Sequence, residues 1–170
     1  CHHDYFQHDG FTAISNTDFY NAIRRVVDAT SATEAHVRLA GDGDPTIVGA
    51  EELCDLIVRL RKIPQVKKIK MTTNGILLGG MVEELKKVGI DGVTISLNSL
   101  TKSNYIKYAQ FDGLHFVLES LKKAFDAGIN LKINTIYYKW NETEIDAFEE
   151  LSSQYNGMCI KVFDLLTSSD

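Results

Sequence analysis

Residues 66–99 have the sequence VKKIKMTTNGILLGGMVEELKKVGIDGVTISLNS. Residues 66–75 predict a strand that runs into a turn, and apolar residues at helical spacing over 81–88, closed by Gly89, predict a helix. Residues 91–99 form a β-branched run that stops in polar residues, which predicts a second strand. A strand, a helix and a strand in this order indicate a parallel β-α-β unit with a right-handed crossover.

The same alternation continues on both sides of this unit. We expect a helix first, with Asn16 or Thr17 as its cap, and a last helix in which Asn141 and Glu144 are spaced as a capping box. Further helix-period and strand-type segments cover 50–60 and 116–125, and 35–41, 129–138 and 157–166. The chain therefore predicts an α/β fold of five parallel strands. Because the series begins with a helix, we expect that its first strand is missing, which would leave an exposed sheet edge.

Composition limits the classes of function. With 170 residues, 44% apolar and 24% charged, the chain fits one domain, residues 1–170, with a sizeable core. A net charge of −5 without a basic block argues against nucleic acid or a membrane as partner, and no apolar run is long enough to span a bilayer. Three widely spaced cysteines form no disulfide framework and suggest a reducing cytoplasm.

Polar residues stand at all five predicted strand ends, whereas the strand bodies are apolar. In parallel α/β folds, ligands bind at the carboxyl ends of strands. We therefore expect a ligand pocket on one rim of a barrel-like sheet. The strand ends are RLAGDGDPT (38–46), TTNG (72–75), SLNS (96–99), LKIN (131–134) and FDLL (163–166).

Each of these features also has an ordinary structural explanation. A glycine-rich loop or an Asn-Gly pair is usually a turn, and Lys132 is a solvated charge unless it is buried and paired. Cys54 and Cys159 fit buried apolar positions better than ligand positions. The sequence has no phosphate-binding GxGxxG or GxxxxGK[ST] motif and no Ser-His-Asp elbow, which argues against a Rossmann or P-loop enzyme.

The N-terminal stretch CHHDYFQHDG (1–10) is dense in metal-binding residue types. A zinc site built from Cys1 and the histidines is one interpretation, but it lacks recognisable ligand spacing and a second half-site. The alternative is that Cys1 is the remnant of a longer motif.

The order of the strand-end motifs, from Cys1 followed by His2 through VRLAGDGDPT, MTTNGILL, VTISLNSL, LKINTIYY and IKVFDLL, resembles the radical S-adenosylmethionine (SAM) enzymes. In detail it is similar to the GTP 3′,8-cyclases of molybdenum cofactor biosynthesis, over nearly all 170 residues. The resemblance implies a partial TIM-type (β/α)6 barrel and a radical SAM core domain that is incomplete at its N-terminus. Cys1 matches the third cysteine of the CxxxCxxC loop that holds a [4Fe–4S] cluster, so the first strand and two cysteines would lie upstream.

The resemblance also implies site residues, none of them a catalytic side chain. Gly41, Gly43 and Asp44 stand where the family has its GGEP loop, so Gly43 and Asp44 would meet the methionine amino group of SAM. The other SAM positions are Ser96, Asn134 for the ribose and Leu166 in the adenine pocket. The positions that would contact GTP are Arg38, Thr72 and Lys132.

The implied activity is that of a lyase in the cytoplasm, with a cluster and SAM that generate a 5′-deoxyadenosyl radical. Its partners would be GTP or another small molecule and an electron donor such as flavodoxin or ferredoxin. These 170 residues alone would be inactive, because one thiolate cannot hold the cluster. Two alternatives stay open: a radical SAM enzyme with another substrate, for example a peptide-modifying maturase, and a degenerate non-catalytic homologue. The sequence departs from the family pattern at GDGDP, where GGEP is usual, and at SLNS, where SLDS is usual.

Overall fold

A computed structural model describes residues 14–41, 43–138, 141–156 and 158–164. These residues form one sheet of five parallel strands in the sequential order β1-β2-β3-β4-β5. The strands are β1 (Ala35–Leu39), β2 (Val66–Thr73), β3 (Gly92–Ser96), β4 (Leu131–Tyr137) and β5 (Cys159–Asp164). The α-helices are α1 (Asn16–Thr30), α2 (Ala50–Arg61), α3 (Val82–Lys87), α4 (Lys102–Ala109), α5 (Leu114–Asp126) and α6 (Ile145–Gln154). None of the described helices is long and apolar enough to cross a membrane.

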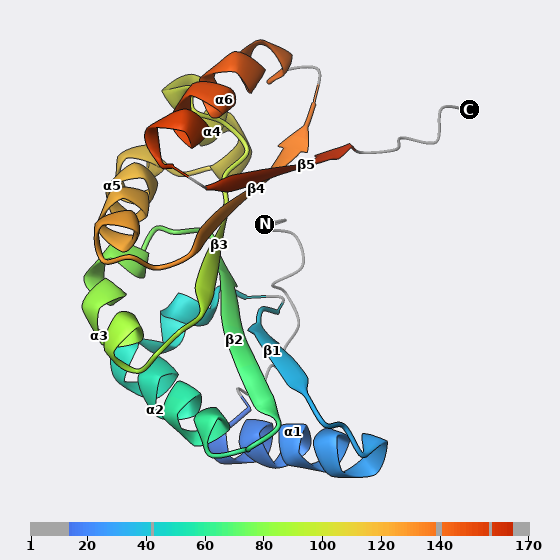
Figure 1. The fold of residues 1–170 in the computed structure, drawn as a ribbon. Helices are drawn as coiled ribbons and strands as arrows, with labels where there is room; N and C mark the ends of the chain where they lie inside the picture. Colours follow the sequence, from blue (N-terminus) through green and yellow to red (C-terminus); the bar gives the residue numbers. More distant parts are fainter. Residues whose placement is uncertain (1–13, 42, 139–140, 157, 165–170) are drawn as a thin grey trace.

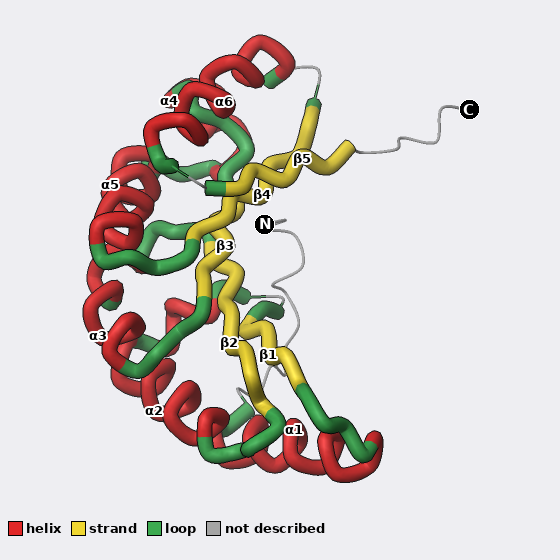
Figure 2. The backbone as a smooth tube through the Cα atoms, in the orientation of Figure 1, coloured by secondary structure: helices red, strands yellow, loops and turns green. Residues whose placement is uncertain are grey.

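The sheet is curved, and the helices lie along its convex side (Figure 1). The α2, α3 and α5 helices follow that side as a continuous outer layer, and α1 packs against α2 at the β1 end of the sheet. Figure 2 shows that no helix of the described residues covers the concave side. This arrangement confirms the predicted α/β fold of parallel strands curved as part of a barrel.

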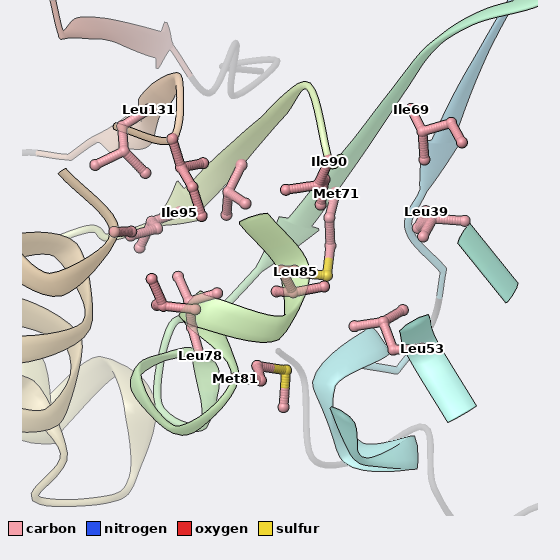
Figure 3. Close-up of a cluster of buried hydrophobic side chains, with 14 of the residues drawn as sticks. Leu39, Leu53, Ile69, Met71, Leu78, Met81, Leu85, Ile90, Ile95 and Leu131 are labelled. Carbon is pink, nitrogen blue, oxygen red and sulfur yellow. The ribbon is translucent and has the colours of Figure 1, made fainter. Parts of the chain in front are cut away.

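The core lies between the sheet and the outer helices. Because side chains alternate along a strand, every second residue of β1 to β4 points toward the helices. On the strands these residues include Leu39, Ile69 and Ile95, which face Leu53 of α2 and Leu85 of α3 (Figure 3). The intervening strand residues are thereby directed to the concave side.

Three local expectations were wrong. The first helix is capped by Ser15, whose hydroxyl accepts from the Asp18 amide, rather than by Asn16 or Thr17. The α4 helix was not expected, because its eight residues have only a weak apolar stripe. The capping box of Asn141 and Glu144 does not form, since neither side chain makes a capping hydrogen bond to its own helix.

Gly75 ends the turn after β2 and has a φ of +83°, in the left-handed region that favours glycine. A β-carbon at this position would lie 3.1 Å from Cγ2 of Ile95 and 3.1 Å from Cγ1 of Val117. Both backbone conformation and packing therefore require a glycine here.

We predict that Gly75→Ala lowers the free energy of unfolding by about 1–3 kcal/mol, because it combines left-handed strain with overpacking. Urea denaturation followed by circular dichroism measures this change. Gly80→Ala is the matched control, because a β-carbon there meets no atom within 4 Å and its φ is not in the left-handed region. Equal stability of the two variants would contradict this account of the turn.

Candidate cofactor and substrate site

The Asp44 carboxylate joins the loop after β1 to the end of β2. Its Oδ1 accepts from the Thr46 amide at 3.0 Å and the Thr46 hydroxyl at 2.5 Å, and the Thr73 hydroxyl lies 2.9 Å from both oxygens. Its Oδ2 accepts from the Asn74 amide at 2.5 Å. A carboxylate has about four acceptor positions, so these donors use all of them. Asp44 therefore fixes its own segment, residues 43–46, against the TTNG turn.

Two buried asparagines join the ends of β3 and β4. Asn98 Oδ1 accepts from the Ile136 amide at 2.8 Å, and Asn141 Nδ2 donates to the carbonyls of Asn98 and Ile136, both at 2.8 Å. Asn141 Oδ1 accepts from the Tyr138 amide at 2.7 Å. These bonds satisfy backbone groups that leave the ladder at the strand ends. The SLNS and TIYY segments are consequently held as one unit.

Glu144 is a buried carboxylate, only 4% exposed, that binds the loop after β3. Its oxygens accept from the Ser99 hydroxyl at 2.8 and 2.9 Å, from the amides of Leu100 and Thr101 at 2.6 and 3.0 Å, and from Asn104 Nδ2 at 2.7 Å. Burial by itself would raise the pKa of Glu144, but these hydrogen bonds outweigh it and hold the pKa below its ordinary value. Glu144 therefore remains ionised at neutral pH and fixes the rim.

The concave side of the sheet carries the predicted site residues in three rows across the strands. Nearest the carboxyl rim, Ser96 pairs with Asn134. Two residues further from the rim, Thr72, Thr94 and Lys132 lie in register. A third row, deeper again, contains Arg38, Lys70 and Gly92. Five of the predicted residues thus share one face: Arg38, Thr72, Ser96, Lys132 and Asn134.

Charge on this face has one sign. The inward positions of the described strands hold no Asp or Glu, and they include Arg38, Lys70, Lys132 and Lys161. No side-chain hydrogen bond or ion pair joins Arg38, Lys70 or Lys132 to another described residue. Several cations on the helices do form ion pairs, for example Arg59 with Asp55 at 2.6 Å. In a chain of net charge −5, this face is suited to an anion.

Lys161 and Lys70 are site candidates that the sequence analysis missed. Lys161 lies in register with Asn134, and its Nζ is 4.3 Å from the centroid of the Phe163 ring. Lys70 is the register partner of Arg38. Lys70 and Thr72 are two residues apart, so the sequence predicts that they share one face of the strand. It does not show which face is the concave one.

Asn134 and the glycine loop have features that fit a polar ligand at the rim. The Oδ1 atom of Asn134 is buried, and no described residue donates to it. Such an acceptor is costly to leave without a donor, and a ligand hydroxyl could supply one. Gly41 and Gly43 are exposed in the loop beside Asp44, and a β-carbon on either would meet no atom within 4 Å.

The described residues contain no site for an iron–sulfur cluster. Cys54 is half-buried on α2, on the helix side of the sheet, and Cys159 is exposed on the concave side of β5, so the expectation that both are buried was wrong. Within the described ranges, no three His, Cys, Asp or Glu side chains group so that they could hold a metal. The predicted ligand Cys1 and the predicted adenine contact Leu166 are outside the described residues.

A sequence profile described as the radical SAM superfamily matches residues 18–151. The chain belongs to the radical SAM superfamily. This match confirms the family indicated by the strand-end motifs, and it covers both the GDGDP loop and the SLNS segment. It includes every described site residue except Lys161.

Several similar curated proteins are named GTP 3′,8-cyclases. A GTP 3′,8-cyclase of Clostridium botulinum is 38% identical over 139 residues, which are 80% of this chain and 43% of that protein. A GTP 3′,8-cyclase of Clostridium perfringens is 34% identical over 145 residues, 85% of this chain and 42% of that protein. A probable GTP 3′,8-cyclase of Sulfurisphaera tokodaii is 38% identical over 111 residues, 65% of this chain and 34% of that protein. The chain spans less than half the length of these relatives.

Solved structures share the fold. The structure of native anSMEcpe with bound AdoMet superposes with a TM-score of 0.78 at 14% identity, over 98% of this chain and 47% of that chain. The Streptococcus suis SuiB structure bound to S-adenosylmethionine gives a TM-score of 0.70 at 17% identity, over 95% of this chain and 37% of that chain. The partial barrel architecture of this radical SAM chain is thereby confirmed.

We predict that Glu144→Gln lowers the free energy of unfolding at pH 7 by about 2–4 kcal/mol, because it removes charge-assisted hydrogen bonds from a buried site. The folded-state pKa is depressed, so this stability is fully present above the unfolded pKa of about 4.5 and is lost as the pH falls through the lower folded value. Urea titrations between pH 3 and pH 7 should therefore show the difference from the parent shrinking below about pH 4.5.

Glu142→Gln serves as the matched control, because Glu142 begins the short 3-10 helix Glu142–Glu144 that also contains Glu144, and its side chain is exposed. It should change stability by about 0.5 kcal/mol or less. A Glu144→Gln difference that did not vary with pH would show that the charge of Glu144 is not what stabilises the rim.

Proposed function

We propose that this chain is the core of a radical SAM enzyme that binds SAM at the carboxyl rim of the sheet and GTP on its concave face. The activity would be that of a GTP 3′,8-cyclase, a lyase of molybdenum cofactor biosynthesis. Superfamily membership and relatives of that name at 34–38% identity support this proposal. The observation that carries it is the pair Arg38 and Lys132, two cations on one concave face without a counter-charge among the described residues.

Arg38 and Lys132 are suited to a triphosphate. A guanidinium fork binds two phosphate oxygens at once, and an ammonium group acts as a point charge. Both sit on a sheet face that offers no carboxylate among its described inward positions, so a bound phosphate would meet no repulsion there. Thr72 is on β2, which lies between the strands that carry Arg38 and Lys132, and its hydroxyl can donate one further hydrogen bond to the phosphates.

SAM would occupy the rim one row above. Ser96 and Asn134 are register partners there, and the buried Oδ1 of Asn134 can accept a hydrogen bond from a ribose hydroxyl. The four donors on Asp44 leave its carboxylate no free acceptor, so the amino group of SAM would displace a donor or bind a backbone carbonyl of the glycine loop.

With a [4Fe–4S] cluster and an electron donor such as flavodoxin or ferredoxin, bound SAM would supply a 5′-deoxyadenosyl radical. The role of this chain would be to hold SAM and GTP in adjacent rows of the sheet. The Ser96 row and the Thr72 row are two residues apart, about 7 Å along the strands. Ligands in these rows would place the sugar of the substrate beside SAM, which is the orientation that a hydrogen abstraction requires.

We predict that the full-length protein, reconstituted without oxygen with iron and sulfide and then reduced, converts SAM to 5′-deoxyadenosine in a GTP-dependent reaction. Arg38→Ala and Lys132→Ala should each lower the GTP-dependent rate at least 10-fold and leave the Kd for SAM within about 2-fold, because they act on phosphate. Liquid chromatography of 5′-deoxyadenosine and of the GTP-derived product measures the rate, and calorimetric titration with SAM measures its Kd.

Lys87→Ala, which removes an exposed charge from α3, is the control and should match the parent. SAM cleavage that does not depend on GTP and is unchanged by Arg38→Ala and Lys132→Ala would indicate another substrate, such as a peptide. Absence of 5′-deoxyadenosine from the reduced, reconstituted protein would indicate a non-catalytic homologue.

A further inference from the structure

We propose that Lys70 is a further phosphate ligand of this site, that it contacts the terminal phosphates, and that it selects a nucleoside triphosphate over the monophosphate. This inference rests on the proposed function, since it concerns the same site. No motif and no comparison assigns a role to Lys70. Its position in the sheet carries the inference.

Lys70 belongs to the concave face by its register and its burial pattern. Its neighbours Ile69 and Met71 are fully buried against the helices, so the side chain of Lys70 between them leaves the opposite side of β2. Lys70 is partly buried, pairs directly with Arg38 on β1, and lies two residues before Thr72. Lys70 is thus in the same row as one predicted GTP contact and next to the row of the other two.

The pair Arg38 and Lys70 is unfavourable without an anion. Like charges directly opposite each other on adjacent strands destabilise a sheet, and their strands are about 4.8 Å apart. No carboxylate among the described residues forms an ion pair with either side chain. A bound phosphate would turn the repulsion between Arg38 and Lys70 into a net attraction, because both cations would then have a common partner.

The strand between Lys70 and Lys132 carries no long side chain on this face. On β3, Lys70 is paired with Gly92, which has no side chain, and Lys132 is paired with Thr94. From the strand spacing and the two-residue offset, the Cα atoms of Lys70 and Lys132 are about 12 Å apart. Two extended lysine side chains on a concave surface can reach one polyphosphate across this distance.

The order of the rows fixes which phosphates Lys70 would contact. The row of Ser96 and Asn134 is at the rim, the row of Thr72 and Lys132 follows, and Lys70 lies in the third. The proposed function places the sugar beside SAM at the rim, and the proposed phosphate contacts Lys132 and Arg38 lie in the two deeper rows, so the phosphate chain would extend toward these rows. Lys70, about 13 Å from the rim row, would lie nearer to the terminal phosphates than to the α-phosphate.

The test uses the full-length, cluster-reconstituted protein with saturating SAM, and calorimetric titration with GTP, GMP and inorganic tripolyphosphate. Lys70→Gln should weaken GTP and tripolyphosphate binding about 10- to 100-fold, the usual effect of losing one charge-assisted hydrogen bond, and change GMP binding less than about 3-fold. Lys70→Arg should restore GTP affinity to within about 5-fold. Without ligand, Lys70→Gln should melt at the same temperature as the parent or higher, because the like-charge pair is gone.

Lys67→Gln is the matched control, since Lys67 is on the same strand but donates to the carbonyl of Pro64. Equal GTP affinity of the Lys70 and Lys67 variants, or an equal loss for GMP and GTP, would overturn the role of Lys70 and leave the proposed function standing. Lys70-dependent binding of tripolyphosphate by a protein that does not bind GTP would support Lys70 and contradict GTP as substrate. A protein that binds none of the three phosphates would overturn both.

Discussion

The packing of apolar side chains between a parallel sheet and its outer helices is the constraint on which this structure depends. Because strand residues alternate between two sides, burial of Leu39, Met71 and Ile133 against the helices decides where their neighbours point. Arg38, Thr72 and Lys132 reach the concave face as a consequence of that burial. A change in the register of one strand by a single residue would exchange the two sets and remove the site.

Two carboxylates hold the rim above this face in place. Asp44 connects the ends of β1 and β2, and Glu144 connects the loop after β3 to the loop before α6. Both carboxylates have a structural role, because their oxygens accept hydrogen bonds from other residues of the protein. Their effect on a ligand is indirect, because they set the positions of the glycine loop and of the SLNS segment that would contact it. Polar residues at strand ends therefore divide into those that face the ligand and those that fix the loops.

The sequence was sufficient for the alternation of strands and helices and for the family, because long apolar runs at period 2 or near 3.6 and the order of strand-end motifs are local signals. It was not sufficient for the role of Glu144, whose spacing from Asn141 resembles a capping box but whose partners, Ser99 and Asn104, are 45 and 40 residues away. Lys70 was also missed, because one lysine in a strand is informative only when its neighbours across the sheet are known. The roles of all the site residues stay predictions, and two of these residues, Cys1 and Leu166, lie outside the described residues.

The most direct test of a concave phosphate site is a crystal structure of the full-length, reconstituted protein with SAM and GTP, grown without oxygen. We predict that the triphosphate of GTP lies along the concave face, with oxygens within about 3.2 Å of Arg38 and Lys132. The ribose of GTP should be the part of the nucleotide nearest the rim row of Ser96 and Asn134. A triphosphate bound on the helix side, or a nucleotide oriented with its phosphates at the rim and its sugar at Arg38, would contradict this prediction.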